Sequence, residues 1–183
     1  MVVVLVVLLM VLKGRRRPPS DGVSAAERVF IGLGANLGDP RAALLQAFEQ
    51  LANLPGTRLV ARSSLYRTVP VDAQGPDFCN AVAELATTIE PQDLLQALQD
   101  IENSHGRQRP FFNAPRTLDL DLLLFGQRQI NDRRLTVPHP RLHQRAFVLV
   151  PLQELAPDLT HPSLGSLTKL ALGLHKQPIE RLT

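Results

Sequence analysis

Apolar positions follow two different periods along the chain. RVFIGLGANLGDP predicts a strand over residues 29–33, then a Gly/Asn turn, then a helix with Asp39 as N-cap and Pro40 at its first position. In PRAALLQAFEQLANLPG, apolar residues recur at helical spacing up to the stop at Pro55-Gly56. This part of the chain therefore predicts one strand followed by one helix.

Two extended segments and a second helix follow. TRLVARSSLYRTVPV is mixed, DFCNAVAELATTI alternates, and the turn residues DAQGP lie between them, so we predict two strands joined by a loop. EPQDLLQALQDIENSHGR predicts a helix that ends at Gly106, with four residues inward: Leu94, Leu95, Leu98 and Ile101. Further on, RLTVPHPRLHQRAFVLVPLQELAPD is interpreted as a strand end, a turn and an apolar segment interrupted by prolines.

RTLDLDLLLFG places two charges in an otherwise apolar strand. Asp119 and Asp121 would share one face of that strand, whereas a helix would separate them by about 200°. The other face would be lined by Leu118, Leu120 and Leu122. Two neighbouring carboxylates repel each other, so this face needs a positive partner. Two interpretations stay open at this point: arginines on a solvated strand face, or a hard divalent cation bound by carboxylate oxygens.

Basic side chains are dense on both sides of this carboxylate pair. They are Arg107, Arg109 and Arg116 before it, and Arg134, Arg141 and Arg145 around His139 after it. So many guanidinium groups are appropriate to a triphosphate ligand.

The predicted elements define the fold class and a single domain. The order strand, helix, strand, strand, helix, strand predicts an α+β fold with a ferredoxin-like βαββαβ core, whose mainly antiparallel sheet is flanked by helices. A chain of 183 residues with 44% hydrophobic and 20% charged residues fits one globular domain. We assign it to residues 28–183 and place residues 1–27 outside the fold.

The N-terminal segment MVVVLVVLLMVLKGRRRPPSDGVSAAE differs in composition from the rest. Its apolar run would extend about 18 Å as a helix, too short for a hydrocarbon core of about 30 Å. Its basic residues follow the apolar run, whereas a secretory signal carries them in front. Three interpretations stay open: a mis-assigned start or dispensable extension, a weak membrane-surface anchor, and a signal. We expect no stable membrane insertion.

Charge and cysteine content exclude some classes of function. The sequence pI of about 9.6 suggests a polyanionic partner, but four of the 20 basic residues lie at positions 13–17, and the remainder of the chain is nearly balanced in charge. We therefore expect no nucleic-acid partner. Cys79 is the only cysteine and cannot form an internal disulfide, which favours a reducing compartment, and we expect cytoplasmic localisation.

Several blocks, in order along the chain, resemble one enzyme family. They are IGLGANLGD, SSLYRTVPV, PDFCNAVAEL, NAPRTLDLDLLLFG and VPHPRLHQRAFVLVPLQELAPD, and they resemble the 6-hydroxymethyl-7,8-dihydropterin pyrophosphokinases of folate biosynthesis over about residues 28–158. The resemblance implies a ferredoxin-like enzyme that transfers pyrophosphate from its co-substrate ATP to the hydroxymethyl group of a reduced pterin, releasing AMP. Separately, we expect a monomer. The chain departs from the family pattern at Pro110 and Asn113, which bear on loop closure.

The resemblance also implies roles for single residues. Two Mg²⁺ ions would bind to Asp119 and Asp121. The catalytic arginines would be Arg107 and Arg116. The nucleotide would contact Gln99, Glu102, Arg134, His139 and Arg145. The pterin would contact Thr68, Val71, Phe78, Asn80 and Phe147, with the two phenylalanines stacked on either side of its ring.

Alternatives to this interpretation remain. One is a two-metal phosphodiesterase or nuclease that uses the same two aspartates; another is a non-catalytic nucleotide-binding protein at a membrane surface. A zinc site at His139 and His143 is disfavoured, because Pro140 lies between them and the sequence offers no third ligand. The general base also stays open between Asp121 and a metal-bound water.

Overall fold

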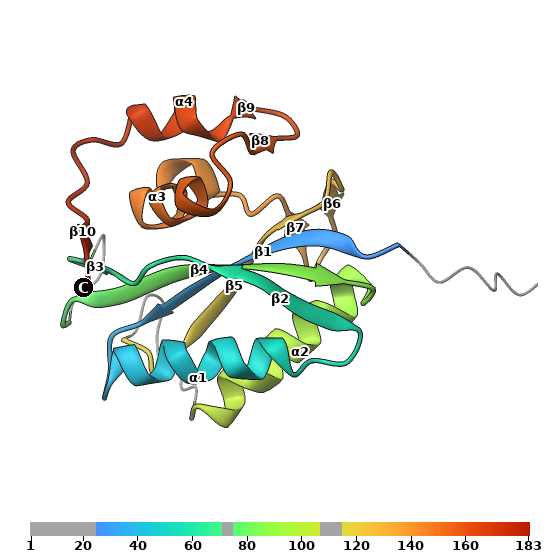
Figure 1. Ribbon diagram of the computed structural model, residues 1–183, viewed down its shortest axis with the longest axis horizontal. Coiled ribbons are helices and arrows are strands. Elements are labelled where there is room, and N and C mark those ends of the chain that lie inside the picture. Colours follow the sequence, from blue (N-terminus) through green and yellow to red (C-terminus); the bar gives the residue numbers. More distant parts are fainter. Residues whose placement is uncertain (1–24, 71–74, 107–114) are drawn as a thin grey trace, which may run out of the picture.

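A computed structural model describes residues 25–70, 75–106 and 115–183 as three layers, with a sheet between two pairs of helices (Figure 1). The strands of the sheet are β1 (Glu27–Ala35), β2 (Thr57–Arg62), β3 (Tyr66–Thr68), β4 (Phe78–Thr87), β5 (Asp119–Phe125) and β10 (Glu180–Arg181). Their order is β10-β3-β4-β1-β5, β2 also pairs with β4, and every pairing is antiparallel. The predicted α+β class with an antiparallel sheet is confirmed.

The helices cover both faces of this sheet. On one face lie α1 (Pro40–Ala52) and α2 (Pro91–Ser104), and on the other α3 (Ala146–Leu155) and α4 (Leu167–Leu172) (Figure 1). A 3₁₀ turn, Leu142–Gln144, precedes α3. Two small hairpins lie outside the main sheet: β6 (Ile130–Asn131) with β7 (Thr136–Val137), and β8 (Thr160–His161) with β9 (Gly165–Ser166).

The predicted ends of the first elements agree closely with the structure. β1 begins at Glu27, one residue before the expected start of the domain. α1 begins at Pro40, and the Asp39 carboxylate accepts a hydrogen bond from the Ala42 N–H at 3.0 Å, as an N-cap does. α2 ends just before Gly106, whose φ of 73° suits glycine at that position.

One prediction about strands was wrong in detail, and one irregularity of β5 was not predicted. The first extended segment is two strands, β2 and β3, because the Ser63 hydroxyl replaces a backbone carbonyl as acceptor of the Val82 N–H at 2.9 Å. In β5, Leu123 is an extra residue between the pairs Ile31–Leu122 and Phe30–Leu124. This bulge reverses the alternation after Leu123: Leu122 and Phe125 belong to one buried cluster, whereas Leu123 and Leu124 belong to the other, so β5 buries both of its faces toward its C-terminal end.

The apolar segment after the 3₁₀ turn, for which no helix was predicted, is the helix α3. Pro151 lies inside it, so the Phe147 carbonyl has no backbone donor four residues on. Valines further lower the helical propensity of this segment. The helix is stabilised instead by burial of Val148, Leu149 and Leu152 against the sheet.

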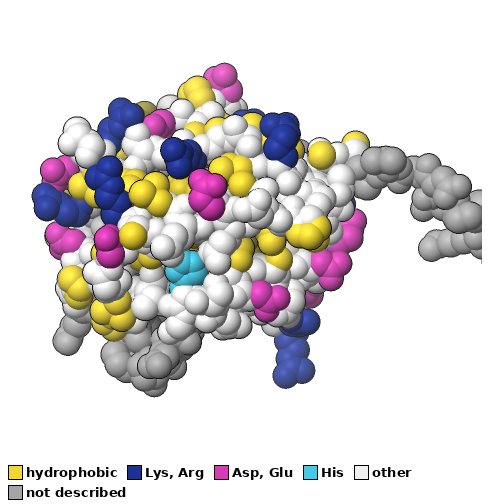
Figure 2. Space-filling model, turned by 60° about the horizontal axis from the view of Figure 1, so that its bottom comes forward, with side chains coloured by type: hydrophobic (Ala, Val, Ile, Leu, Met, Phe, Trp, Pro, Cys, Tyr) yellow, Lys and Arg dark blue, Asp and Glu magenta, His cyan; other side chains and the backbone are white. Residues whose placement is uncertain are grey.

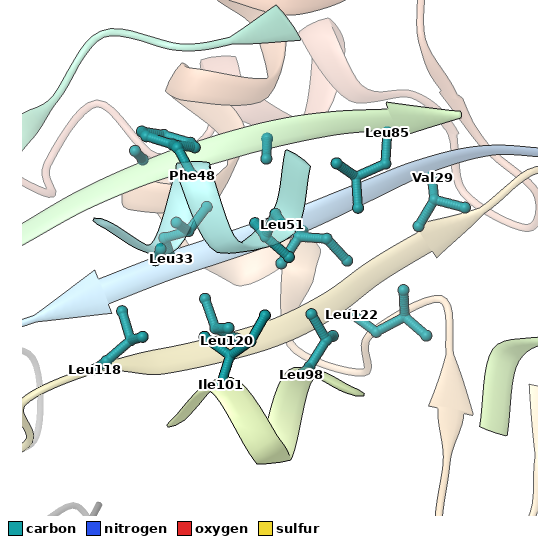
Figure 3. Close-up of a cluster of buried hydrophobic side chains, with 14 of the residues drawn as sticks. Val29, Leu33, Phe48, Leu51, Leu85, Leu98, Ile101, Leu118, Leu120 and Leu122 are labelled. Atoms are coloured by element: carbon teal, nitrogen blue, oxygen red, sulfur yellow. The ribbon is translucent and has the colours of Figure 1, made fainter. Parts of the chain in front are cut away.

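Buried apolar side chains form two clusters, one on each face of the sheet. Figure 3 shows the first, in which side chains of β5 meet Phe48 and Leu51 of α1 and Leu98 and Ile101 of α2. The second lies between the sheet and α3 and includes Phe30 of β1. Burial of both clusters fixes the register of β5, since a slip by one residue would exchange its faces.

One carboxylate ties α3 to the edge of the sheet. Glu154 of α3 accepts hydrogen bonds from the Ser64 backbone N–H at 3.0 Å, the Ser64 hydroxyl at 2.7 Å and the Tyr66 hydroxyl at 2.9 Å. Burial acts to raise the pKa of Glu154, but these hydrogen bonds outweigh it and hold the pKa below its ordinary value. Burial and the bond to Glu154 raise the pKa of Tyr66 to about 12.

Glu154→Gln should lower the free energy of unfolding by about 1–3 kcal/mol near neutral pH, because charge-assisted hydrogen bonds are replaced by neutral ones. A depressed folded pKa means that this contribution is present above the ordinary value of 4.5 and disappears as the pH falls through the folded pKa. Urea unfolding at about pH 7 and about pH 3 measures it, with exposed Glu49→Gln as control. A variant that is equally destabilised at both pH values would contradict this assignment.

The molecular surface bears on the expected partners. Figure 2 turns the side with α1 and α2 toward the viewer, and basic, acidic and apolar side chains are interspersed there. Among the described helices, none is both long and apolar enough to cross a bilayer. The apolar N-terminal run lies outside the described residues, so the interpretations of it stay predictions.

Candidate functional site

The two aspartates of β5 lie on the face of the sheet that α3 covers. Asp119 is paired with Gly34 of β1, and Asp121 is paired with Gly32. Gly32 is also paired with Val82 of β4, whose side chain belongs to the cluster between the sheet and α3, so all of these residues share that face. Glycine has no side chain, so neighbouring side chains approach this strand closely: a Cβ at Gly32 would lie 3.3 Å from Leu123 Cδ2. A Cβ at Gly34 would approach the Asn80 side-chain oxygen to 3.3 Å. On this face, β1 therefore presents two glycines beside the carboxylates, and Leu123 and Asn80 lie close above them.

Three basic side chains converge on this carboxylate pair. Arg116 Nη1 lies 2.6 Å from Asp119 Oδ2. Arg145 Nη1 lies 3.5 Å from Asp121 Oδ2, and His139 Nε2 lies 3.8 Å from the same oxygen. The structure thus brings together five of the residues that the sequence proposed for the site, from three separate segments.

The electrostatics of the pair favour an added positive charge. Burial, and then the charge of Asp119, raise the pKa of Asp121 above its ordinary value. Burial lowers the pKa of His139 and that of Arg145. The Nδ1 atom of His139 accepts from the Arg141 backbone N–H at 3.2 Å, so a neutral His139 carries its proton on Nε2, facing Asp121. The positive charges of the neighbouring bases therefore offset only part of the cost of burying the Asp121 carboxylate.

This donor set suits Mg²⁺. Asp119 and Asp121 offer only oxygen ligands, and among the described residues no group of three or more His, Cys, Asp or Glu side chains could hold a metal ion. Mg²⁺ is often bound by one or two carboxylates, while phosphate oxygens and water complete its octahedron. The two carboxylates therefore fit a cation that arrives with a phosphate ligand.

Asn36, which the sequence interpretation overlooked, links the segments around the site. Its side-chain oxygen accepts from the Arg116 backbone N–H at 2.8 Å, and its Nδ2 donates to the Pro76 carbonyl at 3.2 Å. Its own N–H donates to the Arg116 carbonyl at 3.0 Å, and the residue is 2% exposed. The signal was present in GLGANLGD, which was interpreted only as a Gly/Asn turn between a strand and a helix.

A polar pair lies on the same face of the sheet, one strand further on. Asn80 of β4 donates from Nδ2 to the Thr68 hydroxyl of β3 at 2.8 Å, and both are buried. Phe78 is paired directly with Thr68, so its side chain lies on this face too. Phe147, the second residue of α3, packs against the cluster on the same face, and the Arg145 guanidinium lies 5.4 Å from its ring centroid.

Other proposed residues lie apart from this face. Gln99 and Glu102 belong to α2, on the opposite side of the sheet, and Glu102 accepts from the Leu120 N–H at 2.8 Å while only 2% exposed. Arg134 is exposed in the β6–β7 hairpin. Val71 and Arg107 lie outside the described residues, so their placement stays a prediction.

The lone cysteine has a structural position. Cys79 is buried in the cluster toward α1 and α2, away from its neighbours Phe78 and Asn80, as its place in the strand predicts. Burial raises the pKa of its thiol. It therefore belongs to the core and not to the site.

Fold and site together define an α+β protein with paired carboxylates, a converging set of bases and a buried polar pair on one face of its sheet. Residues 30–157 match the sequence model of the family described as 7,8-dihydro-6-hydroxymethylpterin-pyrophosphokinase (HPPK). This chain belongs to that family. The assignment favours neither the phosphodiesterase nor the membrane-surface alternative.

Characterised relatives agree with this assignment. The protein named 2-amino-4-hydroxy-6-hydroxymethyldihydropteridine pyrophosphokinase from Pseudomonas aeruginosa is 48% identical over 157 residues, which cover 85% of this chain and 97% of that protein. The protein of the same name from Haemophilus influenzae is 45% identical over 142 residues, or 77% of this chain and 89% of that protein.

Solved structures share the fold. A crystal structure of HPPK-DHPS in complex with substrates aligns with a TM-score of 0.69 at 12% identity, covering 84% of this chain and 44% of that chain. Wild-type HPPK-DHPS from Plasmodium falciparum, with pterin and p-hydroxybenzoate, aligns with a TM-score of 0.65 at 14% identity, covering 82% and 43%. This chain thus spans less than half of those proteins.

Proposed function

We propose that this protein transfers the pyrophosphoryl group of ATP to the hydroxymethyl group of 6-hydroxymethyl-7,8-dihydropterin in folate biosynthesis, releasing AMP. One observation carries the proposal: the carboxylates of β5 and the polar pair of β3 and β4 lie on the same face of the sheet, with Gly32 and Gly34 of β1 between them. A phosphate chain at the carboxylates and a flat ring at the polar pair would thereby meet over β1. Positioning of the two reactants supplies much of the rate of such a transfer.

At the phosphate end, Asp119 and Asp121 would hold two Mg²⁺ ions together with phosphate oxygens. The ions, when bound, neutralise charge on the triphosphate and orient it. Arg116, Arg145 and His139 already surround the carboxylates, so they would turn toward the phosphates as these enter. Four residues complete the proposed phosphate and nucleotide contacts from outside this cluster: Gln99, Glu102, Arg107 and Arg134.

At the pterin end, Phe78 and Phe147 would stack on the two faces of the ring, and Asn80 would form hydrogen bonds with polar groups at the ring edge. Because Asn80 Nδ2 is engaged by Thr68, the Asn80 oxygen is oriented to accept from a ring N–H. The backbone near Thr68 and Val71 would complete this edge. A site that hydrogen-bonds a ring edge discriminates strongly against analogues that lack the matching groups.

The proposal also covers the setting of the enzyme. We infer a ferredoxin-like core from the path β2-β4-β1-β5 and from the crossovers through α1 and α2. The catalytic domain would span residues 28–183, with residues 1–27 outside it, and the enzyme would act as a cytoplasmic monomer.

The test is an assay of the full-length protein with ATP, Mg²⁺ and 6-hydroxymethyl-7,8-dihydropterin that resolves AMP, ADP and inorganic phosphate. We expect AMP to form in equal amount to pterin pyrophosphate, and only when pterin is present. A reaction without pterin is the control. ADP as the product, or AMP formed at the same rate without pterin, would contradict the proposal.

A further inference from the structure

The N-terminus of α3 is capped by a residue far away in the sequence. Arg145 occupies the N-cap position without a side-chain capping bond. Instead, the Ala146 N–H donates to the Gln177 side-chain oxygen at 2.9 Å, and Gln177 Nε2 donates back to the Gln144 carbonyl at 2.8 Å. The Gln177 side-chain amide thus binds the backbone on both sides of Arg145. It provides an acceptor for the Ala146 N–H, which has none within the helix.

Gln177 is held in place by its own segment. Its backbone N–H donates to the Leu174 carbonyl at 2.9 Å in the turn after α4, and Pro178 restricts it to extended conformations. Beyond it, β10 pairs with β3, and the Leu182 N–H donates to the Leu65 carbonyl at 2.8 Å. The amide is therefore presented from a segment that is fixed at both ends.

A surface pocket lies beside the capped turn. It has a volume of about 290 Å³, and α3 and the C-terminal segment line it, among them Ala146, Gln177 and Ile179. A backbone next to a pocket loses contacts on that side, so hydrogen bonds contribute more to its position.

Two residues proposed for the site, Arg145 and Phe147, lie next to this cap. Arg145 points its guanidinium at Asp121, 3.5 Å away, and at the ring of Phe147, whose centroid lies 5.4 Å away. A shift of the turn would therefore move the base at the carboxylates together with the aromatic ring that packs against the same face of the sheet.

We propose that Gln177 is a positioning residue, which sets Arg145 and Phe147 by capping α3 from the C-terminal segment. The proposal rests on the proposed pyrophosphoryl transfer for its catalytic consequence. It concerns a residue beyond 157, outside the part of the chain that matches the family's sequence model.

The experiment compares the full-length wild type with Gln177→Ala and Gln177→Glu. Glutamate keeps the acceptor for the Ala146 N–H and loses the donor to the Gln144 carbonyl. Gln177→Glu should therefore retain more activity than Gln177→Ala. Gln129→Ala is the matched control, because it removes an exposed glutamine that accepts one long-range bond, from Ser163 at 3.3 Å. Measured are kcat and KM for ATP and pterin, the thermal midpoint, and hydrogen exchange of the Ala146 amide.

For Gln177→Ala we expect kcat/KM for the pterin to fall about tenfold, with the thermal midpoint within about 3 °C of the wild type and faster exchange at Ala146. Gln177→Glu should lie between this variant and the wild type. Wild-type exchange at Ala146, or unchanged kcat/KM in Gln177→Ala, would overturn the inference. A wild type without pterin-dependent AMP formation would overturn the proposed function instead, while the exchange measurement would still decide whether Gln177 caps the helix.

Discussion

Asp121→Asn should reduce pterin-dependent AMP formation by more than about 10³-fold while leaving the fold as stable as the wild type or more so. Asparagine has nearly the same shape as aspartate but lacks the charge that would bind Mg²⁺. Because burial and Asp119 raise the pKa of Asp121, the folded state disfavours its charged form. A carboxylate whose pKa is raised in the folded state makes that state more stable as the pH falls and the group is protonated. Asparagine resembles the protonated form of Asp121 already at neutral pH.

Enzyme assays and thermal unfolding with and without Mg²⁺ and ATP measure both parts of this prediction. The midpoint of the wild type should rise when both ligands are added together, since ligands that bind only the folded state stabilise it. That rise should be lost in Asp121→Asn. Exposed Asp158→Asn is the control, and it should behave as the wild type. If Asp121→Asn keeps a tenth or more of the wild-type activity, the proposal that this carboxylate binds Mg²⁺ is contradicted.

The sequence predicted the parts of the fold that local rules decide. Asp39 and Pro40 marked the start of α1, and alternation placed both aspartates of β5 on one face, where the structure has them. The bulge at Leu123 could not be predicted in this way, because its cause is the register against β1, a long-range interaction. The α3 helix was missed for a related reason: Pro151 and the valines favour other structures locally, and only packing against the sheet outweighs them.

The site was predicted through its charged residues, and its supporting contacts were not. Asp119, Asp121 and the surrounding bases carry visible chemistry in the sequence. Asn36 and Gln177 are ordinary polar residues there, and their importance depends on partners 80 and 31 positions away. Periodicity and motif spacing contain no information about such pairs, so only coordinates reveal them.

Asn36→Ala should lower both activity and stability, the former by about 10²-fold and the latter by about 1–3 kcal/mol. The substitution leaves the Arg116 N–H and the Pro76 carbonyl without their side-chain partner. Arg116 would then lose the bond to its N–H and would be held only through its carbonyl, which accepts from the Asn36 and Leu37 N–H groups. Because Asn36 is 2% exposed, water cannot replace its bonds without a local rearrangement.

Asn36→Asp separates the two bonds, because aspartate keeps the acceptor for the Arg116 N–H and loses the donor to the Pro76 carbonyl. If the link to Arg116 dominates, Asn36→Asp should retain most of kcat while its KM for the pterin rises, since Pro76 lies just before Phe78. Asn53→Ala serves as control, because it removes one side-chain bond of an exposed asparagine at the end of α1. Steady-state kinetics with both substrates and urea unfolding decide the matter. Equal losses of kcat in Asn36→Asp and Asn36→Ala would show that the contact to Pro76, and not the bond to the Arg116 N–H, is what the reaction depends on.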